Sequence, residues 1–189
     1  MTRALRPFAL LDRDGTLIEE REYAHRPEDY AVLPGAYEAV ARLRGAGFGV
    51  VVITNQSGIG RGLFSASDYR AFEARMLADF AAHGAPLDGC YHCPHAPDAG
   101  CECRKPGVAL GERAAREHRI ELSASFAIGD KDSDVAFARA LGCRAVLVRT
   151  GHGEAHAPRV PADTPVARDL ADAVDRFVLP AARVQPGAQ

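Results

Sequence analysis

Short apolar runs alternate with amphipathic stretches along this chain. Four runs rich in Val, Ile, Leu and Ala predict buried strands at residues 8–12, 49–55, 125–130 and 145–149. Helical patterns beside them predict helices at residues 35–46, 66–83, 107–118 and 132–141. Ser65, with Asp68 three residues on, is placed to cap the second of these helices. Strands that alternate with helices in this way favour an α/β protein with a parallel sheet covered on both faces.

Polar side chains stand where three of the predicted strands end. Asp12 closes the first strand, Thr54 and Asn55 close the second, and Asp130 closes the third. Ligands of open α/β sheets bind at the carboxyl ends of the strands, so we expect these side chains to share one site.

The segment DRDGT, residues 12–16, places two carboxylates one residue apart on a glycine turn. Asp12 can attack phosphorus as a carboxylate nucleophile. Asp14 can give a proton to the leaving oxygen and later take one from water. The same pattern also occurs in ordinary turns and in calcium loops, but a calcium loop needs further acidic ligands that do not follow here at loop spacing. A catalytic pair and a plain turn both stay open at this point.

The acidic segment GDKDSD, residues 129–134, follows the third strand. Asp130 suits a hard Mg²⁺ ion whose other ligands are water and phosphate. Asp134 is better placed to orient its neighbours or to cap the next helix, and acids at a helix start also suit the helix dipole. The presence of Lys131 among these acids favours a functional role for the segment over the helix-dipole explanation alone. Lys131 and Lys105 are the two lysines of a chain rich in arginine, which indicates a need for a compact ammonium group.

Residues 90–106 hold four of the five cysteines and two histidines. Their density is compatible with disulfides, a catalytic thiol or a metal. In a reducing compartment, clustered cysteines more often bind a metal or act in catalysis than form disulfides. The spacing C-x-H and C-x-C gives four soft ligands for a closed, structural, tetrahedral Zn²⁺ site: Cys93, His95, Cys101 and Cys103. Free thiols are the alternative. Cys90 and His92 are left over, and Cys90 is expected to be a small buried apolar side chain.

Length and charge limit the domain number and the kinds of partner that this chain can have. A chain of 189 residues predicts a single domain over residues 1–180, followed by a disordered tail over residues 181–189. The net charge of −2, without a basic block, disfavours a nucleic-acid partner. The amino-terminal residues are too polar for a signal peptide or a membrane span. We expect a cytoplasmic monomer with no membrane partner.

In chain order, DRDGT, Thr54, Lys105 and GDKDSD resemble the four motifs of the haloacid dehalogenase superfamily of phosphohydrolases, over residues 8–150. The resemblance implies a Rossmann-like three-layer fold and a phospho-aspartate intermediate on Asp12, with Asp14 as acid and base. It also implies Mg²⁺ held by Asp12, Asp130 and the main-chain carbonyl of Asp14. Thr54 and Lys105 would neutralise the transferring phosphoryl group.

The motif spacing leaves no room for a large cap domain, the insertion that usually sets substrate choice in that superfamily. A short loop stapled by zinc would instead hold Arg104 and Lys105 over the phosphate. A non-catalytic zinc module is a second reading of the cysteine loop, although it leaves the aspartates and the two lysines unexplained. A phosphotransferase is a third, and it would need a cap to exclude water.

The motifs CPH and CECRKP, together with TNQSGIGRG and GDK, resemble the D-glycero-D-manno-heptose 1,7-bisphosphate 7-phosphatases. That resemblance implies removal of the C7 phosphate from a small phosphorylated sugar. It further implies the substrate contacts Glu20, Arg21, Glu22, Tyr23, Asn55, Gln56, Ser57, Arg104 and Lys131. The segment EREY departs from the acid-x-Gly-Tyr pattern common in that family. Histidinol-phosphate phosphatases share DRDGT and the zinc-loop pattern, and they remain the alternative.

Overall fold

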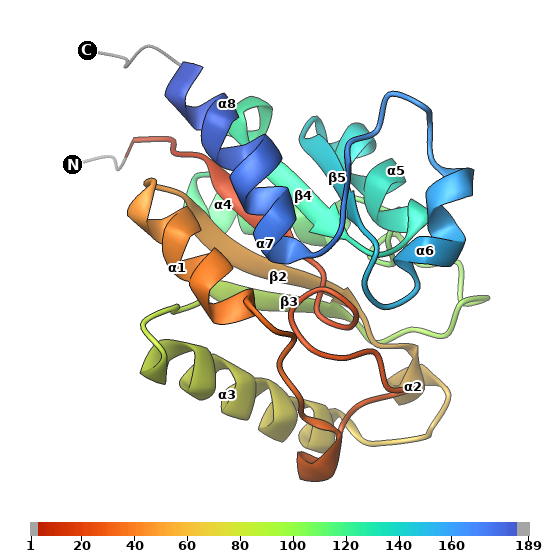
Figure 1. The fold of residues 1–189 in the computed structure, drawn as a ribbon. Helices are drawn as coiled ribbons and strands as arrows, with labels where there is room; N and C mark the ends of the chain where they lie inside the picture. Colours follow the sequence, from red (N-terminus) through yellow and green to blue (C-terminus); the bar gives the residue numbers. More distant parts are fainter. Residues whose placement is uncertain (1–3, 185–189) are drawn as a thin grey trace.

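The computed structural model describes residues 4–184, which form one twisted parallel sheet between two layers of helices (Figure 1). Its strands lie in the order β3-β2-β1-β4-β5-β6. Their bounds are β1 Phe8–Leu11, β2 Gly49–Asn55, β3 Gly89–Cys93, β4 Phe126–Gly129, β5 Arg144–Val148 and β6 Val166–Ala167. This is the Rossmann strand order, whose switch point lies between β1 and β4. The predicted α/β class and parallel sheet are confirmed.

Eight α-helical segments accompany the strands within residues 4–184. They are α1 Ala36–Gly45, α2 Ser57–Gly60, α3 Ala66–Ala82, α4 Ala109–His118, α5 Asp132–Leu141, α6 Gly153–His156, α7 Leu170–Ala173 and α8 Leu179–Val184. Figure 1 shows α1, α3, α7 and α8 on one face of the sheet and α4 and α5 on the other. No inserted cap domain lies among these elements. The longest helix, α3, has 17 residues, and no helix in this part of the chain is long and apolar enough to cross a membrane.

The central strand β1 supplies side chains to both layers because successive residues point to opposite faces of a sheet. Ala9 and Leu11 join the core under α1, α3 and α7. Phe8 and Leu10 join the core under α4 and α5. All four side chains are at most 2% exposed, as expected for a parallel strand covered on both faces.

The start of α3 has the predicted cap. The Ser65 hydroxyl accepts the Asp68 N–H at 3.1 Å, and the Asp68 carboxylate accepts the Ser65 N–H at 2.9 Å. This reciprocal pair satisfies two backbone donors that the first turn of a helix leaves without partners.

Three elements differ from the prediction. Strand β3 lies inside the cysteine-rich stretch that was expected to be a loop, and β6 spans only two residues, too few for a readable pattern. Residues 181–184 continue α8 and are not a disordered tail, because Ala181 and Ala182 pack partly against the core of the α1 face. The rest of that predicted tail, residues 185–189, lies outside the described residues.

Candidate active site

Three carboxylates meet at the switch point of the sheet. Asp12 follows β1, Asp130 follows β4, and Asp134 lies in the first turn of α5. One oxygen of each lies within 4.8 Å of the other two, and the three side chains are almost completely buried. The rule that ligands gather at the carboxyl ends of strands thus brings together residues more than 110 positions apart.

Asp130 has an oxygen that the protein leaves free. Its Oδ2 accepts the His152 N–H at 2.7 Å, whereas Oδ1 is buried without a hydrogen-bond partner in the described chain. The Lys131 ammonium lies 3.8 Å from Oδ1. Burial and the neighbouring charge of Asp12 raise the pKa of Asp130 to about 8. A buried carboxylate oxygen of this kind, close to the Asp12 carboxylate, fits a hard divalent cation such as Mg²⁺.

The turn that carries Asp14 has no room for a side chain at Gly15. Gly15 has a φ of 78°, and a Cβ there would collide with the Asp130 carboxylate. Gly151 has a φ of 57°, and a Cβ there would collide with the same carboxylate and with the Gly15 backbone. Both glycines let backbone close around Asp130, which explains the glycine of DRDGT.

Lys105 joins two of these carboxylates. Its Nζ lies 2.9 Å from Asp12 Oδ1, 2.6 Å from Asp134 Oδ1 and 2.6 Å from the Ile53 carbonyl oxygen. Burial lowers the pKa of Lys105, but the two carboxylates outweigh it and raise the pKa above its ordinary value. Three acceptors surround one compact ammonium group with three donors, a geometry that a planar guanidinium cannot reproduce.

The same lysine keeps Asp12 charged. Burial raises the pKa of Asp12, but the Lys105 and Lys131 ammonium groups outweigh it and bring the pKa below its ordinary value. An anionic carboxylate is the form that can act as a nucleophile. Asp134 accepts the Lys131 N–H at 3.0 Å and holds Lys105, so it orients neighbours and caps α5.

The side chain of Asp14 points to a different set of partners. Arg13 donates to both of its oxygens, at 2.9 and 3.0 Å. Gln56 Nε2 lies 2.9 Å from Asp14 Oδ2 and 2.8 Å from the Thr54 hydroxyl. Because the carboxylate is engaged in this way, the main-chain carbonyl is the group of Asp14 that suits the predicted metal contact.

Asn55 holds the backbone of Lys105. Its Oδ1 accepts the Lys105 N–H at 3.0 Å, and its Nδ2 donates to the Lys105 carbonyl at 3.2 Å. Both ends of the amide are therefore used to position the catalytic lysine candidate. Asn55 still lines the pocket, where the sequence predicted a substrate contact.

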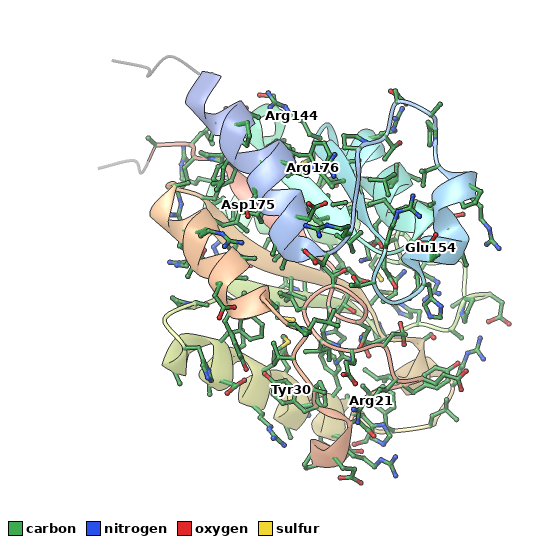
Figure 2. All side chains as sticks on the ribbon, viewed as in Figure 1. Arg21, Tyr30, Arg144, Glu154, Asp175 and Arg176 are labelled. Carbon is green, nitrogen blue, oxygen red and sulfur yellow. The ribbon has the colours of Figure 1, made fainter. Side chains whose placement is uncertain are left out.

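A pocket of about 430 Å³ opens beside the carboxylates. Its walls are Arg13, Asp14, Glu20, Glu22, Tyr23, Asn55, Gln56, Ser57, Arg104, Lys105, Lys131, Ser133 and His152. A smaller recess leads from it to Asp12 and Thr54. Of the nine predicted substrate contacts, Arg21 alone is outside these walls. Its guanidinium pairs with Glu19 at 2.7 Å on the exposed side of the loop that Figure 2 labels with Arg21 and Tyr30.

Sequence reasoning missed three pocket residues, Arg13, Ser133 and His152. His152 follows β5, so the strand-end rule applied to the fourth predicted strand would have indicated it. Its Nε2 lies 3.4 Å from Glu20, which also receives the Lys131 ammonium at 3.2 Å. No sequence signal marked Arg13, whose neighbours in DRDGT carried the argument.

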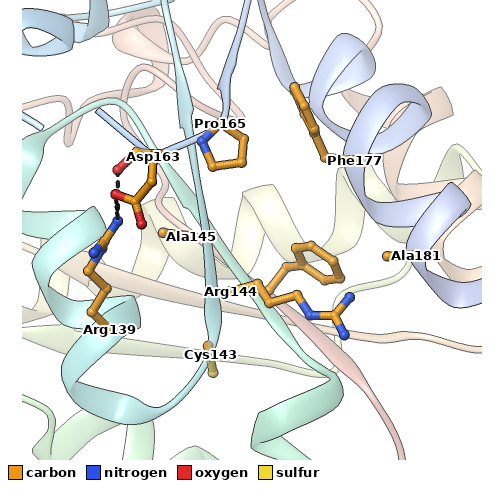
Figure 3. Close-up of a pocket in the computed structure, with 10 residues that line it drawn as sticks. Arg139, Cys143, Arg144, Ala145, Asp163, Pro165, Phe177 and Ala181 are labelled. Atoms are coloured by element: carbon orange, nitrogen blue, oxygen red, sulfur yellow. Dashed lines mark hydrogen bonds and ion pairs between the residues drawn. The ribbon is translucent and has the colours of Figure 1, made fainter. Parts of the chain in front are cut away.

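A second pocket lies at the opposite, amino-terminal end of β4 and β5 (Figure 3). Phe126, Cys143 and Phe177 are among its walls, and an ion pair of 2.6 Å joins Arg139 to Asp163 at its edge. It holds no carboxylate cluster of the kind found beside β1. The chemistry of the molecule is therefore concentrated at the carboxyl end of the sheet.

The four predicted zinc ligands come together at the end of β3, which Cys93 closes, and in the loop that follows it. Their ligand atoms all lie within 4.8 Å of one another. Contacts among them measure 3.2 Å for His95 Nδ1 to Cys103 Sγ, 3.3 Å for Cys103 to Cys93, and 3.6 Å for Cys93 to Cys101. Ligands held tetrahedrally around Zn²⁺ lie about 3.3–3.8 Å apart, so the set fits this ion.

The pKa shifts of the cysteine thiols are consistent with a metal-binding role for the cluster. Burial disfavours the Cys101 thiolate, but hydrogen bonds from Cys93 and from the Arg104 N–H outweigh it and lower the pKa of Cys101 to about 7. Burial raises the pKa of Cys93 to about 12, so that thiol needs a cation to ionise. Cys90 lies apart. It packs partly buried against the core, 3.6 Å from the Tyr69 hydroxyl.

Fold and site define a class. A Rossmann-type sheet with a buried aspartate after β1, a lysine that contacts it and an aspartate after β4 is the arrangement of haloacid dehalogenase-like hydrolases. A family model described as HAD-hydrolase-like matches residues 102–173, which include Lys105 and Asp130.

Similar proteins define the family more closely. The D-glycero-beta-D-manno-heptose-1,7-bisphosphate 7-phosphatase of Bordetella bronchiseptica is 36% identical over 172 residues, covering 89% of this chain and 96% of the relative. The enzyme of that name from Photorhabdus laumondii is 41% identical over 160 residues, covering 80% and 84%. A crystal structure of the B. bronchiseptica phosphatase, complexed with magnesium and phosphate, superposes with a TM-score of 0.85 at 35% identity, covering 92% and 98%. The chain belongs to the D-glycero-D-manno-heptose-1,7-bisphosphate 7-phosphatase family.

Proposed function

We propose that this protein is a Mg²⁺-dependent phosphatase that removes the C7 phosphate of D-glycero-D-manno-heptose 1,7-bisphosphate. The observation that carries the proposal is the buried, anionic Asp12, held by Lys105 beside the free Asp130 oxygen, in a chain whose relatives bear that enzyme name. Its reaction class is phosphoric monoester hydrolysis through a phospho-aspartate.

The reaction has two displacements at phosphorus. In the first, a carboxylate oxygen of Asp12 bonds to phosphorus, the ester bond to the C7 oxygen breaks, and Asp14 gives that oxygen a proton. In the second, water attacks phosphorus, the bond from phosphorus to the Asp12 oxygen breaks, Asp14 takes a proton from the water, and inorganic phosphate leaves with Asp12 restored as a carboxylate. Thr54 and Lys105 face the phosphoryl oxygens during both displacements.

Asp12, Asp130 and the Asp14 main-chain carbonyl would hold Mg²⁺, which supplies positive charge to the phosphoryl oxygens when bound. The donor set is all oxygen, as Mg²⁺ prefers, and the free Asp130 Oδ1 supports it. Asp134 is occupied by Lys105 and serves to orient that lysine.

The outer pocket suits a second anionic group and sugar hydroxyls. Arg104 lines it, and Arg104 Nη1 is buried without a hydrogen-bond partner within residues 4–184. An unpaired buried donor is costly, and a phosphate or hydroxyl oxygen of the substrate would satisfy it. Glu20, Lys131 and His152 form a polar rim opposite, with contacts of 3.2 and 3.4 Å to Glu20. The remaining substrate contacts proposed are Glu22, Tyr23, Gln56 and Ser57.

We also propose that Cys93, His95, Cys101 and Cys103 bind one structural Zn²⁺. With four protein ligands the ion has no open position for a substrate, so its role is to shape the loop that carries Arg104 and Lys105. Reduced thiols suit a cytoplasmic protein, and the slight negative charge suits a small-molecule substrate without a nucleic-acid partner.

Rates on heptose 1,7-bisphosphate and histidinol phosphate, measured side by side with Mg²⁺, test the proposal. We expect efficient release of one phosphate from the heptose bisphosphate, with both anomers assayed, and far slower turnover of histidinol phosphate. Faster hydrolysis of histidinol phosphate would make that the function instead. No release from either ester, nor from an aryl phosphate, would favour a non-catalytic zinc module.

A further inference from the structure

Arg13, the second residue of DRDGT, is among the most buried side chains of residues 4–184, with 1% exposed. Its guanidinium lies over the ring of Phe72 at 4.8 Å and near that of Tyr69 at 5.7 Å. Burying an arginine is costly unless its donors and charge are compensated. Asp14 compensates the charge and accepts from Nε and Nη2, whereas Nη1 is buried without a hydrogen-bond partner within residues 4–184.

Three segments of the site meet at this one guanidinium. Nε and Nη2 form a fork on the two Asp14 oxygens, at 3.0 and 2.9 Å. Nη2 also lies 2.9 Å from the Ala24 carbonyl and 3.2 Å from Gln56 Oε1. Ala24 directly follows the loop of Glu20 to Tyr23, and Gln56 follows β2. Arg13 therefore ties Asp14 to the substrate loop and to the turn after Thr54.

The contact with Gln56 has a further consequence. Because Arg13 can only donate, it fixes Oε1 of the Gln56 amide on its own side. The NH₂ end must then face Asp14 Oδ2 and the Thr54 hydroxyl, where it lies at 2.9 and 2.8 Å. Arg13 thus holds Asp14 directly. It also sets the orientation of the Gln56 amide, which in turn donates to Asp14.

We propose that Arg13 is the positioning residue for Asp14, and that it keeps the carboxyl aligned for proton transfer while linking it to the substrate loop through Ala24. The inference rests on the acid–base role proposed for Asp14. Proton transfer requires the carboxyl within hydrogen-bond reach of the leaving oxygen, and a displacement of about 1 Å can cost about 10²-fold in rate.

The dependence on leaving group tests this role. An alkyl phosphate, such as the C7 ester, leaves as a poor group and needs a proton. The 2,4-dinitrophenyl ester leaves as a stable anion and does not. Values of kcat/KM report the step in which the ester bond breaks. In the Mg²⁺- and zinc-loaded protein, we expect Arg13→Met to lower kcat/KM about 10²-fold on the alkyl ester and less than about tenfold on the dinitrophenyl ester.

Two variants separate this role from a structural one. Arg44→Met removes another arginine–aspartate pair, 2.9 Å from Arg44 to Asp88, at the far end of the sheet. It should change both rates equally or not at all. Arg13→Lys keeps the charge but cannot form the fork, so it should show the same selectivity to a smaller degree. Arg13→Lys also carries the test if Arg13→Met fails to fold, as thermal unfolding would reveal.

Asp14→Asn distinguishes the inference from the function on which it rests. If Asp14→Asn lowers both esters equally, the acid role of Asp14 fails and the inference fails with it. If Asp14→Asn is selective but both Arg13 variants lower the two esters equally, the role of Arg13 alone is wrong. Should the protein not hydrolyse heptose bisphosphate, the same comparison is made with the alkyl phosphate that it does hydrolyse.

Discussion

The molecule has two clusters of metal-ligand residues with opposite characters. The carboxylate cluster, Asp12, Asp130 and Asp134, is buried at the carboxyl ends of the central strands, and Lys105 forms an ion pair with Asp12. The thiolate cluster, Cys93, His95, Cys101 and Cys103, lies at the end of the edge strand β3 and in the loop after it, and of its members Cys93 alone is buried. The first has oxygen ligands and the second sulfur and nitrogen, so the two prefer different ions.

The contrast shows how one chain can place a reactive site and a structural site in different parts of the molecule. The carboxylate cluster leaves the Asp130 oxygen free and opens onto a pocket, as a site that exchanges substrate and ion requires. The thiolate cluster could supply four ligands to one ion and would leave no open position, as the proposed structural Zn²⁺ site requires. Arg104 and Lys105 follow Cys103 directly, so the proposed zinc site would end where the proposed substrate contact and catalytic lysine begin.

The largest effect is expected in the carboxylate cluster. Asp12→Asn should lower phosphate release by at least about 10⁴-fold, because no other group can form the acyl phosphate. Zinc content and thermal unfolding should stay close to those of the unaltered protein, since the amide is isosteric. Phosphate release, elemental analysis and calorimetry on the same preparation check this. Wild-type turnover by this variant with Mg²⁺ would contradict the proposed mechanism.

The second largest effect is expected from metal removal, which should empty the carboxylate cluster and leave the thiolate cluster occupied. Dialysis against a mild chelator should abolish turnover while zinc stays bound, because oxygen ligands hold Mg²⁺ weakly and thiolates hold Zn²⁺ tightly. Added Mg²⁺ should restore the full rate, and added Zn²⁺ should not. If turnover and zinc are lost together and zinc alone restores the rate, the assignment of roles to the two clusters is wrong.

A variant in the thiolate cluster should have an intermediate effect. Cys101→Ser should loosen zinc, lower the unfolding temperature and reduce activity about tenfold or more, because the loop no longer positions Arg104 and Lys105. Cys90→Ser is the matched control, since Cys90 packs against the core outside the cluster and should keep its zinc. Full zinc content in a Cys101/Cys103 double variant would show that the cluster has another purpose.

The two clusters were predictable for different reasons. The thiolate ligands lie within 11 residues of one another, so their spacing alone indicated a metal site. Asp12 and Asp130 are far apart in the chain, but each follows a strand, and parallel strands bring their carboxyl ends to one edge. Asp134 lies in the first turn of α5, four positions after Asp130. Strand β3 was missed because Cys90 to Cys93 were taken for loop, although the segment pairs with β2 over five residues.

Residues whose role depends on side-chain direction could not be predicted. Arg21 lies between two pocket residues of the loop, yet its side chain turns outward to Glu19. Arg13 turns inward and reaches Gln56, 43 positions away. Neighbouring residues in the sequence do not determine either direction. For Arg13, packing against Phe72, far along the chain, accompanies the inward direction.

The narrowest effect, confined to one substrate, is expected at Arg104, which directly follows Cys103 in the chain. Arg104→Ala should lower kcat/KM on the heptose bisphosphate about tenfold or more and leave the rate on an aryl phosphate within about threefold, because the guanidinium contacts the distal part of the substrate and not the transferring phosphoryl group. Arg104→Lys should recover part of the loss, since a single ammonium cannot make the bidentate contact. Equal losses on both substrates, with zinc retained, would place Arg104 with the catalytic residues. Lost zinc would instead show that Arg104 supports the zinc site through its N–H bond to Cys101.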